Sequence, residues 1–199
     1  MRALSGVAWG LAPLPGPGWA LQPAEEASLT GAGSKRRAEF SAGRHLARRI
    51  GQRLGHPIAA LPRRDDGAPA WPSGLLGSIS HCDDLCVVAL APATRLRGLG
   101  VDIEPNRPIE RELWPELFTP EERLWLDRDR TPGVDSSRFA FSAKESYYKA
   151  FAPPDVHSFL DLQVETDGLG FRVVDPVAPI SHRLSVRPLG RWLLTTCSA

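Results

Sequence analysis

GLGVDIEP, from Gly98 to Pro105, places two carboxylates one residue apart at the end of an apolar run. Side chains alternate between the faces of a β-strand, so Asp102 and Glu104 are expected on the same face. Two carboxylates on one face repel each other and are costly to bury unless a cation or hydrogen bonds compensate. A hard divalent ion such as Mg²⁺ would compensate, since it binds carboxylates together with phosphate oxygens. The alternative is an edge strand whose acidic face is solvated.

A second polar stretch, FSAKESYYKA, runs from Phe141 to Ala150 within a helix predicted over Ser136–Phe151. Glu145 would supply a third carboxylate there, and the ammonium groups of Lys144 and Lys149 would bind phosphate oxygens. The same residues also fit an ordinary helix surface, in which Glu145 and Lys149 form an ion pair one turn apart. The motif alone leaves both interpretations open.

The rest of the chain predicts one long helix and several short strands in each half. A helix is expected over Ser34–Leu54, because apolar residues recur at helical spacing and glycine and proline follow. A short helix is expected from Pro23, and another after Thr119, where Glu122 completes a capping box. Strands are expected near residues 85–92, 97–105, 160–166, 171–174, 183–187 and 192–196, with a DGLG turn at 167–170. This pattern favours an α+β fold over a doubly wound parallel sheet.

Composition and charge exclude several classes of protein. A net charge of +1 over 199 residues argues against electrostatic capture of nucleic acid. The three cysteines lack the spacing of a disulfide framework or a zinc site. Prolines interrupt residues 10–18, and no apolar run approaches the ~20 residues of a spanning helix, so neither a signal peptide nor a membrane partner is expected. The sequence therefore predicts a reduced, cytoplasmic protein.

Five stretches in order resemble the signature of 4'-phosphopantetheinyl transferases of the surfactin-synthetase type. Two of them are the GVDIE strand and the FxxKESxxK helix described above. The other three are KRRAEFSAGRHLAR at 35–48, DGAPAWP at 66–72 and GSISH at 77–81, which resemble the subgroup that includes the enterobactin-synthase transferases. Phe141 departs from the family pattern, since many relatives have tryptophan there.

The resemblance implies an enzyme that transfers the phosphopantetheine arm of coenzyme A to a serine of an apo acyl or peptidyl carrier protein, as in natural product biosynthesis, and releases 3',5'-ADP. It implies that Asp102, Glu104 and Glu145 bind Mg²⁺ and that Glu145 also acts as general base. Lys149, with Lys144 nearby, would neutralise charge on the pyrophosphate.

The resemblance also implies a cationic pocket for the 3'-phosphate of coenzyme A. Its residues would be Arg36, Arg44, Arg63, Ser80 and His81. A helical wheel instead puts Arg37 on the face of Arg44, so Arg36 and Arg37 both remain candidates.

The family fold implies two similar halves, 1–98 and 99–199, in a pseudo-twofold arrangement. Each half would be a long helix on a small antiparallel sheet, with coenzyme A between the two, in one fused monomer. The segment 106–130 is either a docking surface for the carrier or core; its large apolar residues are Trp114, Leu117, Phe118, Leu124 and Trp125.

Two other functions remain open. One is a metal-dependent phosphohydrolase that uses Asp102, Glu104 and Glu145. The other is a coenzyme A-binding module without catalysis. The sequence does not identify the carrier proteins, the choice between Mg²⁺ and Mn²⁺, or the tolerance for acylated coenzyme A.

Overall fold

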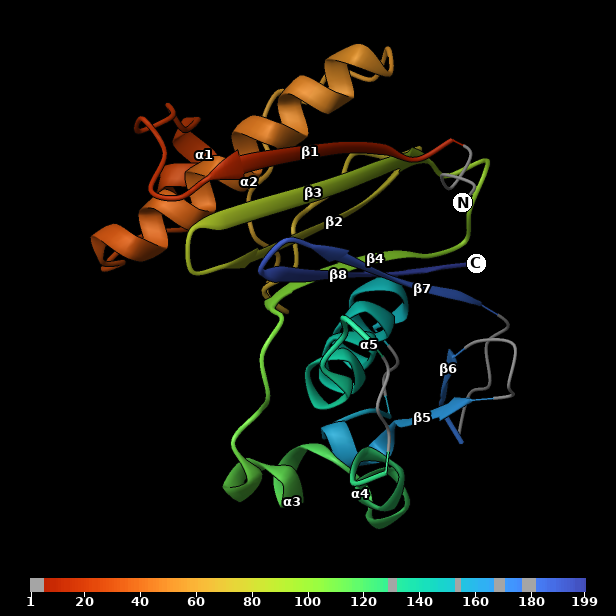
Figure 1. Cartoon of the computed structure of the whole chain (residues 1–199). Helices are drawn as coiled ribbons and strands as arrows, with labels where there is room; N and C mark the ends of the chain where they lie inside the picture. The colour runs from red at the N-terminus through yellow and green to blue at the C-terminus, as the bar shows by residue number, and fades with distance from the viewer. Residues whose placement is uncertain (1–5, 129–131, 153–154, 167–170, 177–181) are drawn as a thin grey trace. The chain divides into compact units, whose positions relative to one another are not determined.

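The computed structural model describes residues 6–128, 132–152, 155–166, 171–176 and 182–199 (Figure 1). The chain divides into two compact units, Met1–Arg97 and Gly98–Ala199. Both combine helices with antiparallel strands, so the expected α+β class is confirmed. The DGLG turn and the proline pair after the second long helix fall outside the described residues. Among the helices described, none is long and apolar enough to cross a membrane.

The first unit, called unit 1 below, is a three-stranded sheet with one long helix packed on it (Figure 1). Its elements are β1 (Ala8–Pro13), α1 (Pro23–Ala27), α2 (Ser34–Arg53), β2 (Leu75–Cys82) and β3 (Leu85–Pro92). The strand order is β1-β3-β2, antiparallel throughout. Phe40, Ala47 and Ile50 of α2 are buried, as the helical spacing of apolar residues predicts. The strand β1 was not predicted, because its stability comes from pairing with the distant β3.

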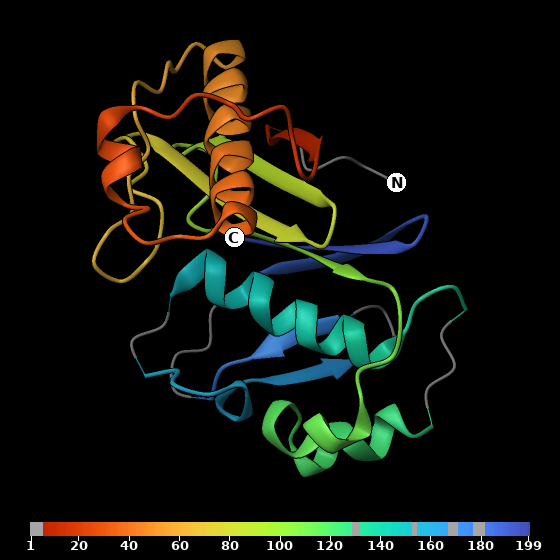
Figure 2. The ribbon, with the colours of Figure 1, turned by 90° about the vertical axis from the view of Figure 1, so that its left-hand side faces the viewer.

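The second unit, unit 2, contains the other long helix between two sheets (Figures 1 and 2). Its elements are β4 (Leu99–Pro105), η1 (Arg111–Leu113), α3 (Trp114–Leu117), α4 (Pro120–Leu126), α5 (Ser136–Phe151), η2 (Phe159–Asp161), β5 (Gln163–Thr166), β6 (Phe171–Val174), β7 (Arg183–Leu189) and β8 (Trp192–Ser198). One sheet has the order β4-β8-β7, and β5 pairs with β6. The helix α5 has the bounds that the sequence predicts, and Thr119 and Glu122 form the expected capping box.

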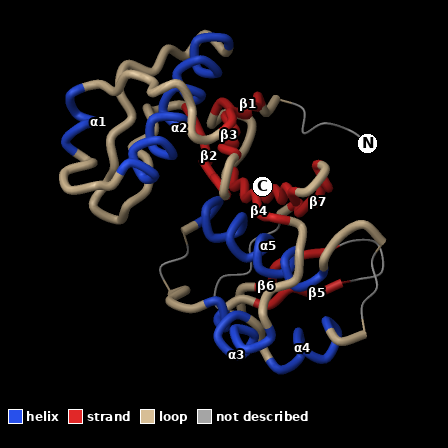
Figure 3. The backbone as a smooth tube through the Cα atoms, turned by 60° about the vertical axis from the view of Figure 1, so that its left-hand side comes forward, coloured by secondary structure: helices blue, strands red, loops and turns tan. Residues whose placement is uncertain are grey.

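The two units share one topology when each is traced separately. In unit 1, β1 is the first strand and pairs with the last, β3, which pairs in turn with β2. In unit 2, the first strand, β4, likewise pairs with the last, β8, which pairs in turn with β7. Each unit also has a short helix that begins with proline before its long helix. The β5–β6 hairpin is an addition to unit 2, and α3 and α4 lie beside each other near it (Figure 3).

The interior of unit 2 includes two of the large apolar residues named for the segment 106–130. Trp114 and Phe118 belong to the core, since they are 8% and 0% exposed and pack edge to face. Leu124, on α4, is 61% exposed. The two aromatic residues are therefore unavailable to a carrier protein, whereas Leu124 is accessible.

The register of α5 on β4 follows from the sequence of the strand. A side chain at Gly100 would place its Cβ 1.8 Å from the carbonyl oxygen of Ser146, and one at Gly98 would meet the ring of Phe151. Two residues of strand and about four residues of helix both advance roughly 6 Å, so each second residue of β4 meets the next turn of α5. The same strand face continues to Asp102 and Glu104, which therefore meet the first half of α5.

Two cysteines in the cores should be chemically inert in the folded protein. Burial raises the pKa of Cys86 and of Cys197 from the ordinary 9.0 to about 12, and a thiol reacts as its thiolate. We expect iodoacetamide at about pH 8 to leave both unmodified in the native protein and to label both after unfolding in guanidinium, as measured by peptide mass spectrometry.

The same raised pKa values predict how stability depends on pH. The folded state keeps protons that the unfolded state loses above pH 9.0, so this contribution to stability is complete below that pH and is lost as the pH rises towards 12. Rapid labelling of native Cys86 by iodoacetamide at about pH 8 would contradict the raised pKa on which both predictions depend.

Candidate active site

Asp102 is the centre of a polar cluster between β4 and α5. Its side chain is almost completely buried, at 2% residue exposure, yet both carboxylate oxygens have partners. Oδ1 accepts a hydrogen bond from Nζ of Lys149 at 2.6 Å, and Oδ2 accepts one from the hydroxyl of Ser142 at 2.7 Å. The charge of Asp102 is thus compensated by one ammonium group and one hydroxyl.

Lys149 joins Asp102 to Glu145. Its ammonium lies 3.3 Å from Oε2 of Glu145, one turn earlier on α5. Long helical side chains point back towards the N-terminus of the helix, which lets Lys149 extend past Glu145 to Asp102. The structure therefore brings together three of the site residues that the sequence singles out, on two elements far apart in the chain.

Glu104 lies beside this cluster and forms an ion pair of 3.0 Å with Arg138 at the start of α5. Burial, followed by the negative charge of Asp102, raises the pKa of Glu104 to about 7, against the opposing effects of Arg138 and Lys149. Burial lowers the pKa of Lys149, but the charges of Asp102 and Glu145 outweigh burial, and the net direction is upward. The cluster is therefore crowded with negative charge that its own cations only partly offset.

The donor set fits a hard divalent cation. Three carboxylates from one strand face and one helix face are the oxygen ligands that Mg²⁺ prefers. Within the described ranges, no three His, Cys, Asp or Glu side chains are arranged to hold a metal ion as they stand. Lys149 and Arg138 each donate to one carboxylate oxygen, of Asp102 and of Glu104 respectively. An ion would compensate the negative charge of Asp102, which adds to burial in raising the pKa of Glu104, and Lys149 would have to release Asp102 to admit it.

Arg138 and Ser142 are site residues that the sequence reasoning missed. They orient Glu104 and Asp102 respectively, through hydrogen bonds of 3.0 and 2.7 Å. Positions 138, 142, 145 and 149 recur at helical spacing on one face of α5. That periodicity could have identified both residues: Ser142 within the motif, and Arg138 about one turn upstream of it.

Lys144 is not brought to the carboxylate cluster. Its side chain is completely buried, and its ammonium donates to Oε2 of Glu122 at 2.6 Å and to the carbonyls of Leu117 and Phe159 at 3.0 and 2.8 Å. An ammonium has three N–H donors, so these three acceptors use all of them. Burial lowers its pKa, although Glu122 opposes the shift. This geometry gives no support to contact between Lys144 and a pyrophosphate.

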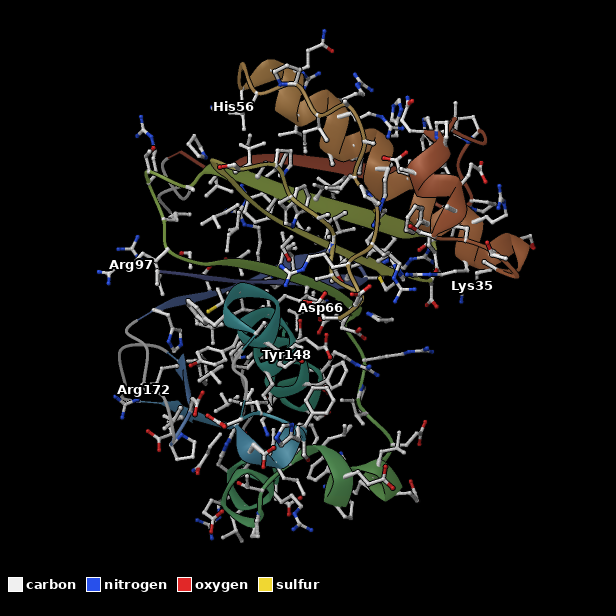
Figure 4. All side chains as sticks on the ribbon, turned by 180° about the vertical axis from the view of Figure 1, so that it is seen from behind. Lys35, His56, Asp66, Arg97, Tyr148 and Arg172 are labelled. Carbon is white, nitrogen blue, oxygen red and sulfur yellow. The ribbon has the colours of Figure 1, made fainter. Side chains whose placement is uncertain are left out.

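A cavity of about 220 Å³ opens beside Glu145. Tyr148, which is 46% exposed and labelled in Figure 4, projects from α5 at its edge. The lining combines residues of α5, Glu145 among them, with a segment around η2 that contributes Val156, Phe159 and Leu162 as its apolar members. The lining residues are Lys144, Glu145, Tyr148, Val156, His157, Ser158, Phe159 and Leu162. The cavity can hold a slender, largely apolar group next to a carboxylate.

Unit 1 contains a separate cationic group. Arg36 lies 3.1 Å from Nε2 of His81, and Glu39 lies within 4 Å of both. Arg44 is buried, with Nε donating to the carbonyl of Leu61 and the guanidinium over the ring of Phe40. Burial lowers the pKa of Arg44 to about 10; Glu25 opposes this, and the charges of Arg36 and Arg63 add to it. We call Arg36, Arg44, Arg63 and His81 the cationic group.

The two arginines that the helical wheel left open have different partners in the structure. Arg36 belongs to the cationic group through His81, whereas Arg37 forms an ion pair of 2.6 Å with Glu26 of α1. Ser80 is buried on β2, next to His81. Arg63 donates from Nε to the carbonyl of Gly67, the second residue of the sequence motif DGAPAWP.

Two family models match the chain. The model described as the 4'-phosphopantetheinyl transferase N-terminal domain matches residues 24–91. The model described as the 4'-phosphopantetheinyl transferase superfamily matches residues 98–197, half of the chain. The chain therefore belongs to the 4'-phosphopantetheinyl transferase superfamily, which confirms the family expected from the motifs.

Individual relatives are consistent with this membership. The transferase PptT of Mycobacterium tuberculosis is 34% identical over 194 residues, which are 92% of this chain and 82% of the relative. The transferase Npt of Nocardia iowensis is 37% identical over 131 residues, 66% of this chain and 59% of the relative. Enterobactin synthase component D of Salmonella typhi is 42% identical over 130 residues, 62% and 52% of the two chains. The chain thus spans little more than half the length of the last two.

Proposed function

We propose that this protein transfers the 4'-phosphopantetheine arm of coenzyme A to a serine hydroxyl of an apo acyl or peptidyl carrier protein, releasing 3',5'-ADP. The observation that carries the proposal is the meeting of Asp102 and Glu145 on the ammonium of Lys149, in a chain of this family. Transfer at a phosphoryl centre mainly requires that reactants be positioned and oxygen charge be neutralised. The carboxylates and ammonium of this cluster are suited to both tasks.

The residues of the cluster divide this work. Asp102, Glu104 and Glu145 would hold Mg²⁺, and the ion when bound would neutralise charge on the pyrophosphate oxygens. Glu145 lines the cavity, which supports the role of its carboxylate as the group that would accept the proton of the carrier serine. Lys149 would turn from Asp102 to the pyrophosphate and neutralise the leaving group. The largely apolar wall of the cavity suits the pantetheine arm.

The cationic group of unit 1 would bind the 3'-phosphate of coenzyme A, with Ser80 beside it. We expect Arg36→Ala to raise the KM for coenzyme A about tenfold and the KM for 3'-dephospho-coenzyme A much less, since a charged hydrogen bond contributes roughly 1.5–3 kcal/mol. The control is Arg37→Ala, which removes an exposed partner of Glu26 and should change neither KM. An equal effect of Arg36→Ala on both substrates would remove Arg36 from the phosphate site.

One assay separates this function from its two rivals. The purified protein is incubated with coenzyme A, an apo carrier and Mg²⁺, and the carrier is weighed by mass spectrometry. We expect a gain of one phosphopantetheine that EDTA abolishes. Release of phosphate without a carrier would support a phosphohydrolase instead. Tight binding of coenzyme A without modification, unchanged in Glu145→Gln, would support a binding module. The monomeric state, cytoplasmic location and pseudo-twofold arrangement stay predictions.

A further inference from the structure

The ion pair of Lys144 and Glu122 is the most completely buried charged contact described in unit 2, with both side chains at 0% exposure. Besides Lys144, Glu122 accepts hydrogen bonds from the backbone amides of Thr119 at 2.8 Å and Val164 at 2.6 Å. Lys144 in turn binds the carbonyls of Leu117 and Phe159. One pair of side chains therefore fastens α5 to the end of α3, the start of α4, the η2 turn and β5.

Stability alone is a poor explanation for such a pair. Two charges lose their hydration when they are buried, and well-packed apolar residues of the same size are often at least as stable. A buried ion pair does fix relative positions, because removal of either partner leaves an uncompensated charge. The question is therefore which positions this pair fixes.

The positions concerned are those of the cavity walls. Phe159, whose carbonyl is held by Lys144, and Leu162, two residues before Val164, form part of the wall that faces Glu145 and Tyr148. The ring of Phe159 also packs against Phe141 of α5 in a tilted arrangement, with centroids 5.1 Å apart. The ion pair thus ties Phe159, a residue of the cavity lining, to α5, which carries the carboxylate proposed as general base.

Unit 1 contains the same device around a different site. Glu25 occupies the third position of α1, as Glu122 does in α4, and is also completely buried. It binds Arg48 of α2 at 2.6 Å and accepts the amide of Leu61 at 2.9 Å. The carbonyl of Leu61 then accepts Nε of Arg44 in the cationic group. In both units a buried glutamate ties the long helix to a segment that holds site residues.

We propose that Lys144 is a positioning residue: through Glu122 it holds the η2 wall of the cavity at the distance from Glu145 that the pantetheine arm requires, and it does not bind the pyrophosphate. This rests on the proposed function for the identity of the arm. The family resemblance implies that Lys144 helps to neutralise the pyrophosphate; the role proposed here is instead to fix the position of the cavity wall.

The test compares binding of coenzyme A with binding of adenosine 3'-phosphate 5'-diphosphate, which keeps the diphosphate and lacks the arm. The variants are Lys144→Met, Lys144→Met/Glu122→Gln, Lys144→Arg and Lys149→Met, with Glu165→Gln as a control that removes an exposed ion pair of unit 2. The double variant leaves no buried charge unpaired, so it stays informative if the single variant unfolds.

We expect the folded double variant to bind the arm-free nucleotide within about twofold of the wild type and to lose at least about fivefold in its preference for coenzyme A. Its kcat for carrier modification should fall at least about tenfold, since small displacements of reacting groups have large effects. Lys149→Met should instead weaken both nucleotides. Lys144→Arg keeps the positive charge but should also lower kcat below the wild-type value, because a planar guanidinium cannot reach three acceptors arranged for an ammonium.

Two results would overturn the positioning role. One is a loss of arm-free nucleotide binding in the Lys144 variants as large as in Lys149→Met, which would make Lys144 a phosphate ligand. The other is a folded double variant with wild-type kcat and wild-type preference for coenzyme A. If the wild type fails to modify any carrier, the proposed function fails, yet the ratio of the two affinities still decides the role of Lys144.

Discussion

Replacement of Asp102 by asparagine should reduce carrier modification about a hundredfold or more. Asparagine keeps the shape of the side chain and can still accept the hydroxyl of Ser142, but it removes the charge that faces Lys149. It also removes one of three proposed Mg²⁺ ligands, so the concentration of Mg²⁺ that gives half-maximal activity should rise. Initial rates with coenzyme A and an apo carrier, measured over a range of Mg²⁺ concentrations, test both effects.

This interpretation requires that Asp102→Asn lose its activity while it remains folded. A buried hydrogen bond to a charged group contributes roughly 1.5–3 kcal/mol, so Asp102→Asn should remain folded at moderate temperature. The matched control is Asp127→Asn, which disturbs an exposed ion pair with Arg111 in the same unit and should keep near wild-type rates. A folded Asp102→Asn protein with an unchanged Mg²⁺ requirement would exclude Asp102 as a ligand.

The sequence predicted those elements whose signals are local. The bounds of α5 and the start of α4 follow from helical periodicity, a capping box and a proline at the first helical position. The strand β1 gives no comparable signal, because short strands depend on partners elsewhere in the chain. Its partner β3 was predicted, but the pairing between the two was not.

The site was predictable to the extent that periodicity constrains it. Asp102 and Glu104 share a strand face, and Glu145 and Lys149 share a helix face, as periodicity predicts. That the two faces meet was implied only by the family resemblance. Lys144 lies away from the carboxylate cluster, with Glu122 as its partner, because consecutive helical residues point about 100° apart and only one of Lys144 and Glu145 can face β4. Arg37 could not be separated from Arg36 by sequence, since its partner Glu26 lies on another helix.

Gly100 is where the fold leaves the least freedom, and Gly100→Ala should be severely destabilising. The added Cβ would lie 1.8 Å from the carbonyl oxygen of Ser146 and 2.8 Å from the amide nitrogen of Ala150. Both are backbone atoms of α5, so no change of rotamer can relieve the overlap and the helix itself must move away from β4. Overpacking of this kind costs about 1–3 kcal/mol and sometimes more, and we expect the upper end of that range.

The control is Gly33→Ala, at the N-cap of α2, where no atom lies within 4 Å of an added Cβ. It should cost less than about 1 kcal/mol, as the midpoint of urea unfolding would show. Because α5 carries Ser142, Glu145 and Lys149, its displacement in Gly100→Ala should also separate them from Asp102 and lower activity in whatever fraction stays folded. Equal unfolding midpoints for Gly100→Ala and the wild type would mean that α5 does not pack on β4 this closely, and the carboxylate cluster would then lose the contact that assembles it.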